Sequence, residues 1–373
     1  MSTIERTVAK ALTQQRIRRR TALKAGLALG GVAGLQGAAS IFMPGRALAQ
    51  DIGITTMRST SKSWLWAAED FATGGGYFAE AGVTVESNAS GRGVNVPALI
   101  GGAVDVVLGT PDQSIRAQVQ NQPVKLIAAT VDKYASNVVV NAEILAERGV
   151  DESSPVADKV EAMRGLRMGT TGPGAAPDSL LRYLFSTGDI NPDTEVELVT
   201  IQGGGSAILA AVEQGVIDGF CLSSPTSDVS NQQFGTAYLF NMATNPPPAL
   251  ENYFYIGCAV LDEAIQERRS DLVAYVKGLT LALRAINDQP DVFREWARGW
   301  FDSLDDQLFD VAFANNSRIY TTSPVPTEAQ FELNKQFVNI GFQTLGEPAL
   351  PEDFSFQDAC DPSIAEEAVA SLN

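Results

Sequence analysis

Short runs of β-branched and other apolar residues alternate with amphipathic stretches from residue 51 onward. Four of these runs predict strands: IGITTM (52–57), VTVESNA (83–89), VDVVLG (104–109) and VKLIAAT (124–130). Between them, apolar positions recur at helical spacing, as in the stretch that follows Ser63, a residue suited to cap a helix. Strands that alternate with helices are typical of a largely parallel sheet. Residues 51–130 therefore predict one complete α/β unit.

The same order of features returns after the strand-like run NVVVN (137–141) and a polar stretch. Three further runs predict strands: LRMGTT (166–171), EVELVTI (195–201) and GVIDGFCLSS (215–224). The segments GAVDVVLGTP (102–111) and GVIDGFCLSSP (215–225) are near copies, each with a glycine that ends a helix and an aspartate that opens a strand. We expect each copy to be the third strand of a separate sheet. The two copies slip by one residue, and any α/β domain produces such look-alikes, so a strict repeat is not inferred.

Beyond the proline-rich break NPPPALENYFYIGCAVL (245–261), the chain has helical periodicity to its end, as in LVAYVKGLTLALRAI (272–286). A long helical tail after two sheet units predicts that the chain crosses to a second lobe, returns, and packs its tail around the first. The expected organisation is an export signal over 1–49, lobe I over 50–134 and 248–373, and lobe II over 135–247.

The first 49 residues have the character of an export signal: a basic start, an apolar middle and the small-residue cleavage site Ala47-Leu48-Ala49. Within the basic start, RRTALK (19–24) resembles the twin-arginine signal, with Ala22 where phenylalanine is usual. The apolar run 25–43 is nearly long enough to span a membrane, but its five glycines and the cleavage site favour a signal. We expect cleavage after Ala49 and a periplasmic protein with no stable membrane insertion.

Charge and residue composition exclude several classes of function. The formal net charge is −17, and removal of residues 1–49, with eight basic side chains and one acid, leaves 19 basic against 43 acidic side chains, or −24. Such a surface repels nucleic acid and anionic lipid. The chain has no histidine, which removes Ser-His and Cys-His nucleophile pairs and two-His metal sites. We expect no catalytic residue, no metal and no cofactor.

Hydroxyl and glycine residues gather at five turns where a strand leads into a helix. In open α/β sheets, ligands bind at such strand ends, where helix N-termini offer free N–H groups and partial positive charge. The candidate ligand-binding residues in and beside these turns are Arg58, Ser61, Trp64, Ser90, Gly91, Arg92, Thr110, Pro111, Thr170, Thr171, Gly174, Ser223 and Ser224. Helix capping demands the same residue types, so each position alone is equally explained by capping. The turns taken together favour a binding cleft.

Cations and aromatic residues near these turns suggest the ligand's chemistry. Arg92, and with less support Arg58 and Lys62, would counter a carboxylate or sulfonate. Trp64 and Trp66 lie on opposite sides of their helix start, so at most one faces the cleft, where it would stack on an aromatic or heterocyclic ligand. Packing in the core is the alternative role for either tryptophan.

The chain resembles the periplasmic solute-binding proteins of ABC importers, of the nitrate, sulfonate and taurine type with its thiamine-pyrimidine-precursor relatives. Five segments carry the resemblance in order over residues 51–290: YFAEAGVTVE (77–86), ALIGGAVDVVLGTP (98–111), QPVKLIAAT (122–130), MRGLRMGTTGPGAAPDSLLRYLF (163–185) and ILAAVEQGVIDGF (208–220). The resemblance implies a type II periplasmic-binding fold, with two doubly wound mixed α/β sheets, a two-strand hinge near 131–137 and 241–252, and a helical C-terminal region.

This resemblance also implies a function. A monomer would capture a small organic or inorganic anion, or a heterocycle, between its lobes and deliver it to an ABC importer permease. Two alternatives stay open. One is an enzyme, because the thiamine-precursor branch includes a pyrimidine synthase that consumes an active-site histidine, which this chain lacks. The other is a ligand sensor that docks on a receptor. Nitrate, a sulfonate, an aromatic carboxylate and a pyrimidine are all compatible with turns rich in hydroxyl and glycine residues.

The three cysteines lie far apart in the chain and lack metal-binding spacing. Cys221 and Cys258 are expected on neighbouring strands, where export would allow a disulfide between them and leave Cys360 free. Alternatively, all three are small buried apolar residues.

Overall fold

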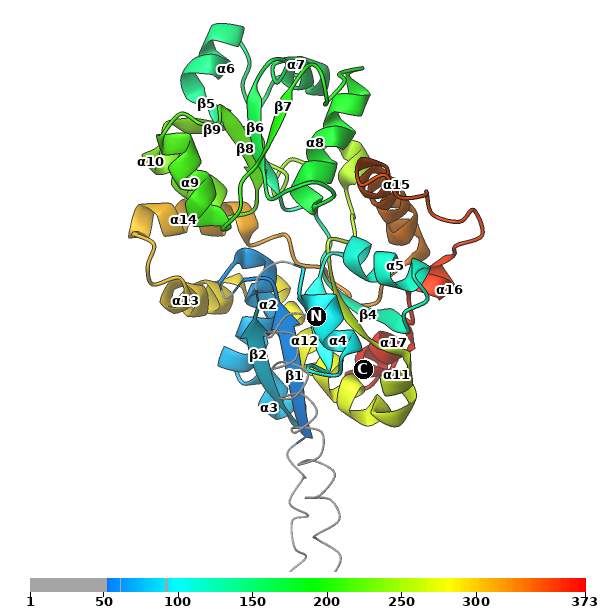
Figure 1. Ribbon diagram of the computed structural model, residues 1–373. Coiled ribbons are helices and arrows are strands. Elements are labelled where there is room, and N and C mark those ends of the chain that lie inside the picture. Colours follow the sequence, from blue (N-terminus) through cyan, green and yellow to red (C-terminus); the bar gives the residue numbers. More distant parts are fainter. Residues whose placement is uncertain (1–51, 61, 91–92) are drawn as a thin grey trace, which may run out of the picture. The chain divides into compact units, whose positions relative to one another are not determined.

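The computed structural model describes residues 52–60, 62–90 and 93–373 (Figure 1). The expected export signal and its cleavage site lie outside these residues, as do Ser61, Gly91 and Arg92. Within the described residues, no helix combines the length and the apolar character needed to cross a bilayer.

The first sheet combines four strands from the start of the described chain with one strand that follows the second sheet in sequence. Its members are β1 (Ile52–Arg58), β2 (Val83–Ala89), β3 (Val106–Gly109), β4 (Val124–Val131) and β10 (Ile256–Leu261). They lie in the order β2-β1-β3-β10-β4, with β1 parallel to β2 and β3, and β10 antiparallel to both of its neighbours. β3, β4 and β10 are almost entirely buried, which explains why their sequences are continuously apolar.

The second sheet repeats this arrangement. Its strands are β5 (Asn137–Asn141), β6 (Arg167–Thr170), β7 (Glu197–Thr200), β8 (Gly219–Leu222) and β9 (Thr236–Phe240). Their order is β7-β6-β8-β5-β9, with β6 parallel to β7 and β8, and β5 antiparallel to β8 and β9. The expected fold class, with two mixed sheets, is confirmed. β3 and β8 hold equivalent places in the two sheets, as the near-copy segments predict.

The aspartate in each near copy has the same structural task. The Asp105 carboxylate accepts a hydrogen bond from the Thr55 backbone N–H at 2.8 Å, and that of Asp218 accepts one from the Arg167 backbone N–H at 2.8 Å. Each carboxylate also pairs with a guanidinium, Arg268 for Asp105 at 2.6 Å and Arg167 for Asp218 at 2.5 Å. Asp105 thus ties the start of β3 to β1, and Asp218 ties the start of β8 to β6.

Helices cover the sheets. Those in the first part of the chain are η1 (Trp64–Trp66), α2 (Ala67–Gly74), α3 (Tyr77–Glu80), α4 (Asn95–Ile100) and α5 (Pro111–Val119). The second sheet has α6 (Ala142–Arg148), α7 (Val156–Glu161), α8 (Ala176–Thr187), α9 (Gly205–Glu213) and α10 (Thr226–Gln233). The C-terminal part contains η2 (Pro248–Leu250), α11 (Asp262–Glu267), α12 (Arg269–Asp288), α13 (Pro290–Trp300), α14 (Asp306–Asn316), α15 (Glu328–Thr344), α16 (Phe356–Ala359) and α17 (Ser363–Ala370).

The C-terminal helices do not pack around the first sheet alone, which corrects the expectation from the sequence. α12 contacts α2, α3 and α17, but α14 packs on α10, and α15 packs on both α5 and α8 (Figure 1). On α14, Asn315 Nδ2 donates to Asp228 Oδ1 at 3.1 Å, and the Tyr238 hydroxyl donates to the same oxygen at 2.7 Å. Buried polar groups require such partners, so this network fixes α14 against the second sheet.

The expected Cys221–Cys258 disulfide is not formed. Cys221 lies in β8 and Cys258 in β10, which belong to different sheets rather than being neighbours. Both cysteines, and Cys360, are free and buried. Burial raises the pKa of each thiol, that of Cys360 to about 12. These side chains therefore behave as small apolar residues of the core.

Gly278 marks the closest approach of α12 to α3. A Cβ atom at this position would lie 2.4 Å from Phe78 Cδ1 and 3.1 Å from Phe78 Cα. Gly278→Ala is expected to lower the free energy of unfolding by about 1–3 kcal/mol, because the overlap exceeds the gain in helix propensity. Urea denaturation measures the change.

Gly299, in α13, provides the matched control. It is exposed, and a Cβ atom there would meet nothing within 4 Å. Gly299→Ala should raise the free energy of unfolding by about 0.5–1 kcal/mol, since only the helix-propensity effect remains. Equal effects of the two substitutions would contradict the packing argument.

Candidate functional site

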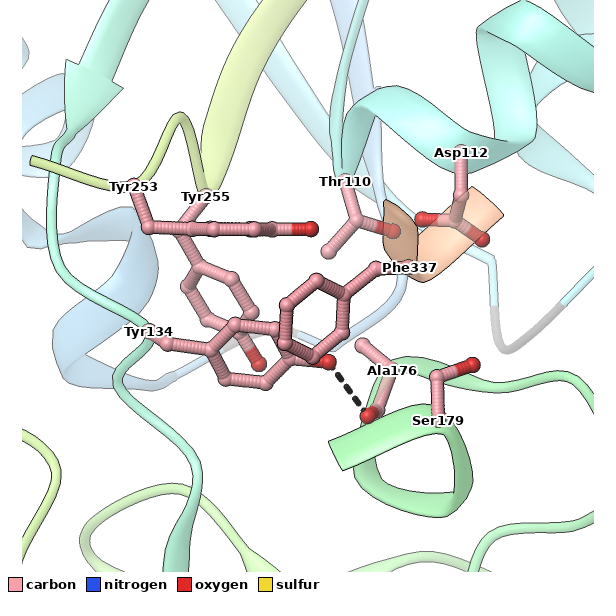
Figure 2. Close-up of a pocket in the computed structure, with 8 residues that line it drawn as sticks. All are labelled: Thr110, Asp112, Tyr134, Ala176, Ser179, Tyr253, Tyr255 and Phe337. Atoms are coloured by element: carbon pink, nitrogen blue, oxygen red, sulfur yellow. Dashed lines mark hydrogen bonds between the residues drawn. The ribbon is translucent and has the colours of Figure 1, made fainter. Parts of the chain in front are cut away.

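A small cavity lies where the start of α5 and the start of α8 face each other (Figure 2). Its volume is about 10 Å³, close to the space that a single water molecule occupies. Eight described residues line it: Thr110, Asp112, Tyr134, Ala176, Ser179, Tyr253, Tyr255 and Phe337. Thr110 precedes α5, which follows a strand of the first sheet, and Ala176 begins α8, which follows a strand of the second. The cavity therefore joins elements of both sheets.

Aromatic side chains from the two crossings between the sheets form one wall. Tyr134 comes from the segment between β4 and β5, and its ring centroid lies 4.7 Å from those of Tyr253 and Tyr255, which precede β10. Phe337 of α15 lies 4.9 Å from Tyr134. The Tyr134 hydroxyl donates to the backbone carbonyl of Ala176 at 2.5 Å, which links the first crossing to α8 (Figure 2).

These aromatic residues were not among the candidates from the sequence. The only available signal is the concentration of tyrosines in both crossings, at position 134 and in the NYFY stretch at 252–255. Burial raises the pKa of Tyr134, Tyr253 and Tyr255, and the negative charge of Asp112 adds to the effect at each. The carboxylate of Asp112 is therefore close enough to be felt by all three phenol groups.

The two helix starts are weak sources of positive potential. Pro111 is the first residue of α5, and Pro177 lies in the first turn of α8, so each helix lacks one of its free N–H groups. Each first turn also carries an acid, Asp112 in α5 and Asp178 in α8. Asp178 accepts a hydrogen bond from the Gly174 backbone N–H at 3.0 Å and pairs with Arg182 at 3.1 Å. An acid in the first turn interacts favourably with the dipole of its helix.

Some residues predicted from the sequence do come together. Thr110 lines the cavity, and Pro111 begins the helix beside it. Gly174 adopts a φ of +68°, and a Cβ atom there would lie 2.8 Å from Leu345, so glycine allows the α8 turn to approach the end of α15. On another path between the sheets, Ser63 Oγ donates to the backbone carbonyl of Ser224 at 3.3 Å.

Thr170, Thr171, Ser90 and Ser223 lie at strand ends without lining this cavity. Thr170 is buried and its hydroxyl accepts from the Gly172 N–H at 3.2 Å. The Ser90 hydroxyl donates to Asn95 Oδ1 at 2.6 Å. These are local turn contacts of the kind that capping predicts, and a ligand role for these four residues stays a prediction.

Arg58 and Trp64 are held inside the protein. Arg58 is 5% exposed, and its guanidinium pairs with Glu69 at 3.3 Å and with Asp70 at 2.6 Å. Trp64 is 0% exposed and stacks on Phe301 with ring centroids 4.2 Å apart. Of the two roles considered for Trp64, packing in the core is therefore the one that the structure shows. Lys62 binds the Trp300 carbonyl at 2.7 Å and Asp302 at 3.0 Å.

A metal site does not emerge from the described residues, which contain no group of three or more metal-ligating side chains placed to share an ion. The residues that line the cavity offer instead hydroxyls, one carboxylate and aromatic faces. Such a set can hold a small polar molecule through hydrogen bonds.

Family comparison agrees with this geometry. Residues 64–298, more than half of the chain, match the model of the NMT1-like family. The chain belongs to the NMT1-like family. Two curated proteins also match parts of the chain. The bicarbonate transport ATP-binding protein CmpC of Synechocystis is 28% identical over 158 residues, 40% of this chain and 23% of CmpC. The nitrate/nitrite binding protein NrtA of Nostoc is 34% identical over 77 residues, 20% of this chain and 17% of NrtA. The chain thus spans less than a quarter of either relative.

Solved structures share the fold of this NMT1-like protein at low sequence identity. The periplasmic nitrate-binding protein NrtA of Synechocystis PCC 6803 has a TM-score of 0.62 and 13% identity, over 87% of this chain and 90% of its own. The alkanesulfonate-binding protein SsuA of Xanthomonas axonopodis pv. citri has a TM-score of 0.62 and 10% identity, over 80% of this chain and 95% of its own. The desulfurization enzyme DSZB has a TM-score of 0.57 and 13% identity, over 87% of this chain and 100% of its own. The resemblance to periplasmic binding proteins is confirmed for the fold.

The buried group formed by Arg58, Glu69 and Asp70 predicts how the stability of the protein depends on pH. Burial raises the pKa of Asp70 to about 7, against the lowering effect of the Arg58 guanidinium. Because the folded protein binds this proton more tightly than the unfolded chain, the stabilising contribution is complete below about pH 4 and is lost as the pH rises to about 7. Asp70→Asn removes this group. The unfolding free energy of Asp70→Asn minus that of the natural protein should therefore increase between pH 4 and pH 7, as measured by urea denaturation.

Glu352→Gln, at an exposed acid in the loop before α16, is the control for a general change in charge. A difference between the natural protein and Asp70→Asn that is constant over this pH range would show that the Asp70 carboxyl does not titrate there.

Proposed function

We propose that this chain is the extracytoplasmic solute-binding protein of an ABC importer. It captures a small polar solute between two lobes and delivers it to the permease. The observation that carries the proposal is the cavity shared by the starts of α5 and α8, which are the helices that follow β3 and β6, one from each sheet. Ligands in open α/β sheets bind at this end of the strands. The names of the relatives add support, since NrtA is a nitrate-binding protein, SsuA binds alkanesulfonates and CmpC serves bicarbonate transport.

In this proposal lobe I comprises 50–134 and 248–373, and lobe II comprises 135–247. The crossings near 131–137 and 241–252 act as the hinge. A cavity of about 10 Å³ admits only a water-sized group, so a nitrate or a larger solute enters when the lobes separate. A ligand that contacts both helix starts then favours the closed population. Export through the twin-arginine-type signal, a periplasmic location and a monomeric state belong to the same proposal.

The alternative of an enzyme has weaker support, although the desulfurization enzyme DSZB shares the fold. The chain has no histidine, and its three thiols are buried with raised pKa values, so neither a Cys-His pair nor an activated thiolate is at hand. We therefore propose binding without turnover.

Substitution of Ser179 tests the binding site. Ser179 is buried at the cavity, so Ser179→Leu should fill the space and lower the affinity for a bound solute by about tenfold or more. Native mass spectrometry of the protein purified from the periplasm identifies a co-purified solute, and calorimetry with that solute measures the affinity.

Ser186→Leu is the matched control, because Ser186 is exposed on the same helix, α8. Its affinity should equal that of the natural protein. X-ray scattering supplies a second readout, in which saturating solute reduces the radius of gyration. A solute that binds without any compaction, and with equal affinity in both variants, would contradict capture between the lobes.

A further inference from the structure

α14 is attached to the two lobes in different ways. Aromatic rings pack it on lobe I, since the ring centroids of Phe309 and Phe313 lie 6.2 and 6.0 Å from that of Trp64. The segment that follows α14 is also tied to lobe I, because the Thr321 backbone N–H donates to the Thr130 carbonyl of β4 at 3.2 Å. Separation of these rings would expose a large apolar surface to water. We therefore expect α14 to stay with lobe I when the lobes move.

Hydrogen bonds join α14 to lobe II. Asn315 Nδ2 donates to Asp228 Oδ1 at 3.1 Å and to the Tyr238 hydroxyl oxygen at 3.3 Å. The Asn315 side chain also accepts from Asn241 Nδ2 at 3.1 Å. We call these four residues the latch. Water can replace each partner of Asn315 once the surfaces part, so the latch can break and form again at modest cost.

The latch is connected to a turn that the sequence marks as a candidate for ligand binding. The Ser224 hydroxyl donates to the Asp228 carboxylate, and the Ser224 carbonyl accepts from Ser63 Oγ of lobe I at 3.3 Å. The carboxylate of Asp228, a residue that is 2% exposed, therefore accepts hydrogen bonds from this turn, from β9 and from α14 together. Release of α14 changes the hydrogen bonding around Ser224.

The opposite side of the junction between the lobes is held by aromatic rings. Figure 1 shows α14 and α15 on different sides of this junction. The Phe337 ring of α15 lies 4.7 Å from Tyr183 of lobe II. It also lies 4.9 Å from Tyr134 and 5.0 Å from Tyr253, which belong to the two crossings. Rotation about this cluster lets some contacts slip while the rings stay packed, whereas full separation would expose them to water.

We propose that the lobes separate on the α14 side, with the aromatic cluster around Phe337 as the pivot, and that release of Asn315 from the latch admits and releases the solute. This inference rests on the proposed function and describes how access to that same site is controlled. α14 then acts as a strap that lobe I extends over lobe II.

Distances between labelled positions test this motion. Single-molecule fluorescence energy transfer is measured on the protein with dyes at Glu80→Cys of lobe I and Glu147→Cys of lobe II, which replace two exposed acids. The natural cysteines are buried, so the dyes attach to the introduced ones. A closed state and a state with a longer distance should both be seen, because a latch of a few hydrogen bonds leaves the open state populated.

A second label position shows which lobe carries α14. Val311 of α14 is 46% exposed, so Val311→Cys can be labelled. In the open state the distance from Val311→Cys to Glu147→Cys should lengthen. The distance from Val311→Cys to Glu80→Cys should stay constant, because the rings hold α14 on lobe I.

Substitution of Asn315 tests the latch itself. Asn315→Ala removes the hydrogen bonds between α14 and the latch residues of lobe II, and it should raise the ratio of open to closed populations about 3- to 30-fold. Gln307→Ala is the matched control, because Gln307 is an exposed amide residue on the same helix. It should leave the ratio unchanged.

Tyr238→Phe gives a readout that a merely structural role would not produce. It removes the hydroxyl that donates to Asp228 and accepts from Asn315, and it should raise the ratio about 2- to 10-fold. The Tyr238–Asp228 bond lies within lobe II, so Tyr238 acts on opening through Asn315. Asn315→Ala and Tyr238→Phe together should therefore raise the ratio by less than the product of their separate effects.

Circular dichroism and thermal unfolding establish that each variant is folded. If Asn315→Ala does not fold, Tyr238→Phe decides, since it removes a single oxygen atom. The inference is overturned if Asn315→Ala behaves as Gln307→Ala does, or if the two latch substitutions combine as independent effects. It is also overturned if α14 moves with lobe II, or if every variant shows one unvarying distance.

Failure of this inference is distinct from failure of the proposed function. The distance measurements need no solute, so a result against the latch leaves solute capture standing. Solute capture is judged instead by the Ser179→Leu affinity and by X-ray scattering, and neither experiment alters Asn315 or its partners.

Discussion

The phenol rings of Tyr134, Tyr253 and Tyr255 pack against one another where the chain passes between its two sheets, with ring centroids 4.7 Å apart for the two pairs that include Tyr134. Tyr134 lies on the outward crossing, and the other two lie on the return. The crossings are thereby held side by side by buried aromatic surface, and the Tyr134 hydroxyl, which donates to the Ala176 carbonyl, connects them to the start of α8. Because the crossings, the start of α5 and the start of α8 all meet here, this contact determines where the cavity lies.

The same arrangement explains the polarity of the site. Each sheet receives one antiparallel strand that arrives by a crossing, β10 between β3 and β4, and β5 between β8 and β9. The parallel strands β3 and β6 then direct the following helices, α5 and α8, toward the crossings. Facing helix starts would ordinarily make a positive region, but proline and aspartate in both first turns reduce it. The cavity is lined by the Asp112 carboxylate, hydroxyl groups and aromatic rings.

The C-terminal helices connect the site to the rest of the molecule. α15 supplies Phe337 to the aromatic wall and packs on both α5 and α8, while α14 joins the second sheet through Asn315 and Asp228. In the proposed mechanism, separation of the lobes must therefore break contacts of α14 and α15 as well as the Tyr134 and Ser63 hydrogen bonds. The polar character of several of these contacts suits a reversible motion, since water can replace a hydrogen-bond partner at modest cost.

Sequence periodicity by itself predicted the strands β1 to β8 and their division between two sheets, because burial on one or both faces leaves a regular trace in the order of apolar residues. It did not predict β9 or give bounds for β10, and the return of β10 to the first sheet was decided only by the tertiary structure. The strands at 83–89 and 137–141 were predicted with the bounds that the structure has, and the near-copy segments were correctly placed as β3 and β8. The part of the cavity at Thr110 could also be predicted, since capping chemistry marks strand ends. Only the tertiary structure decided the partners of each side chain. Arg58 pairs with Glu69 and Asp70, and Trp64 lies in the core. Cys221 and Cys258 belong to different sheets, and tyrosines of the two crossings meet at the cavity that Asp112 also lines. The physical reason is that periodicity records how much water each residue meets, whereas ion pairs and ring contacts join residues far apart in the chain, and no local pattern specifies that distance.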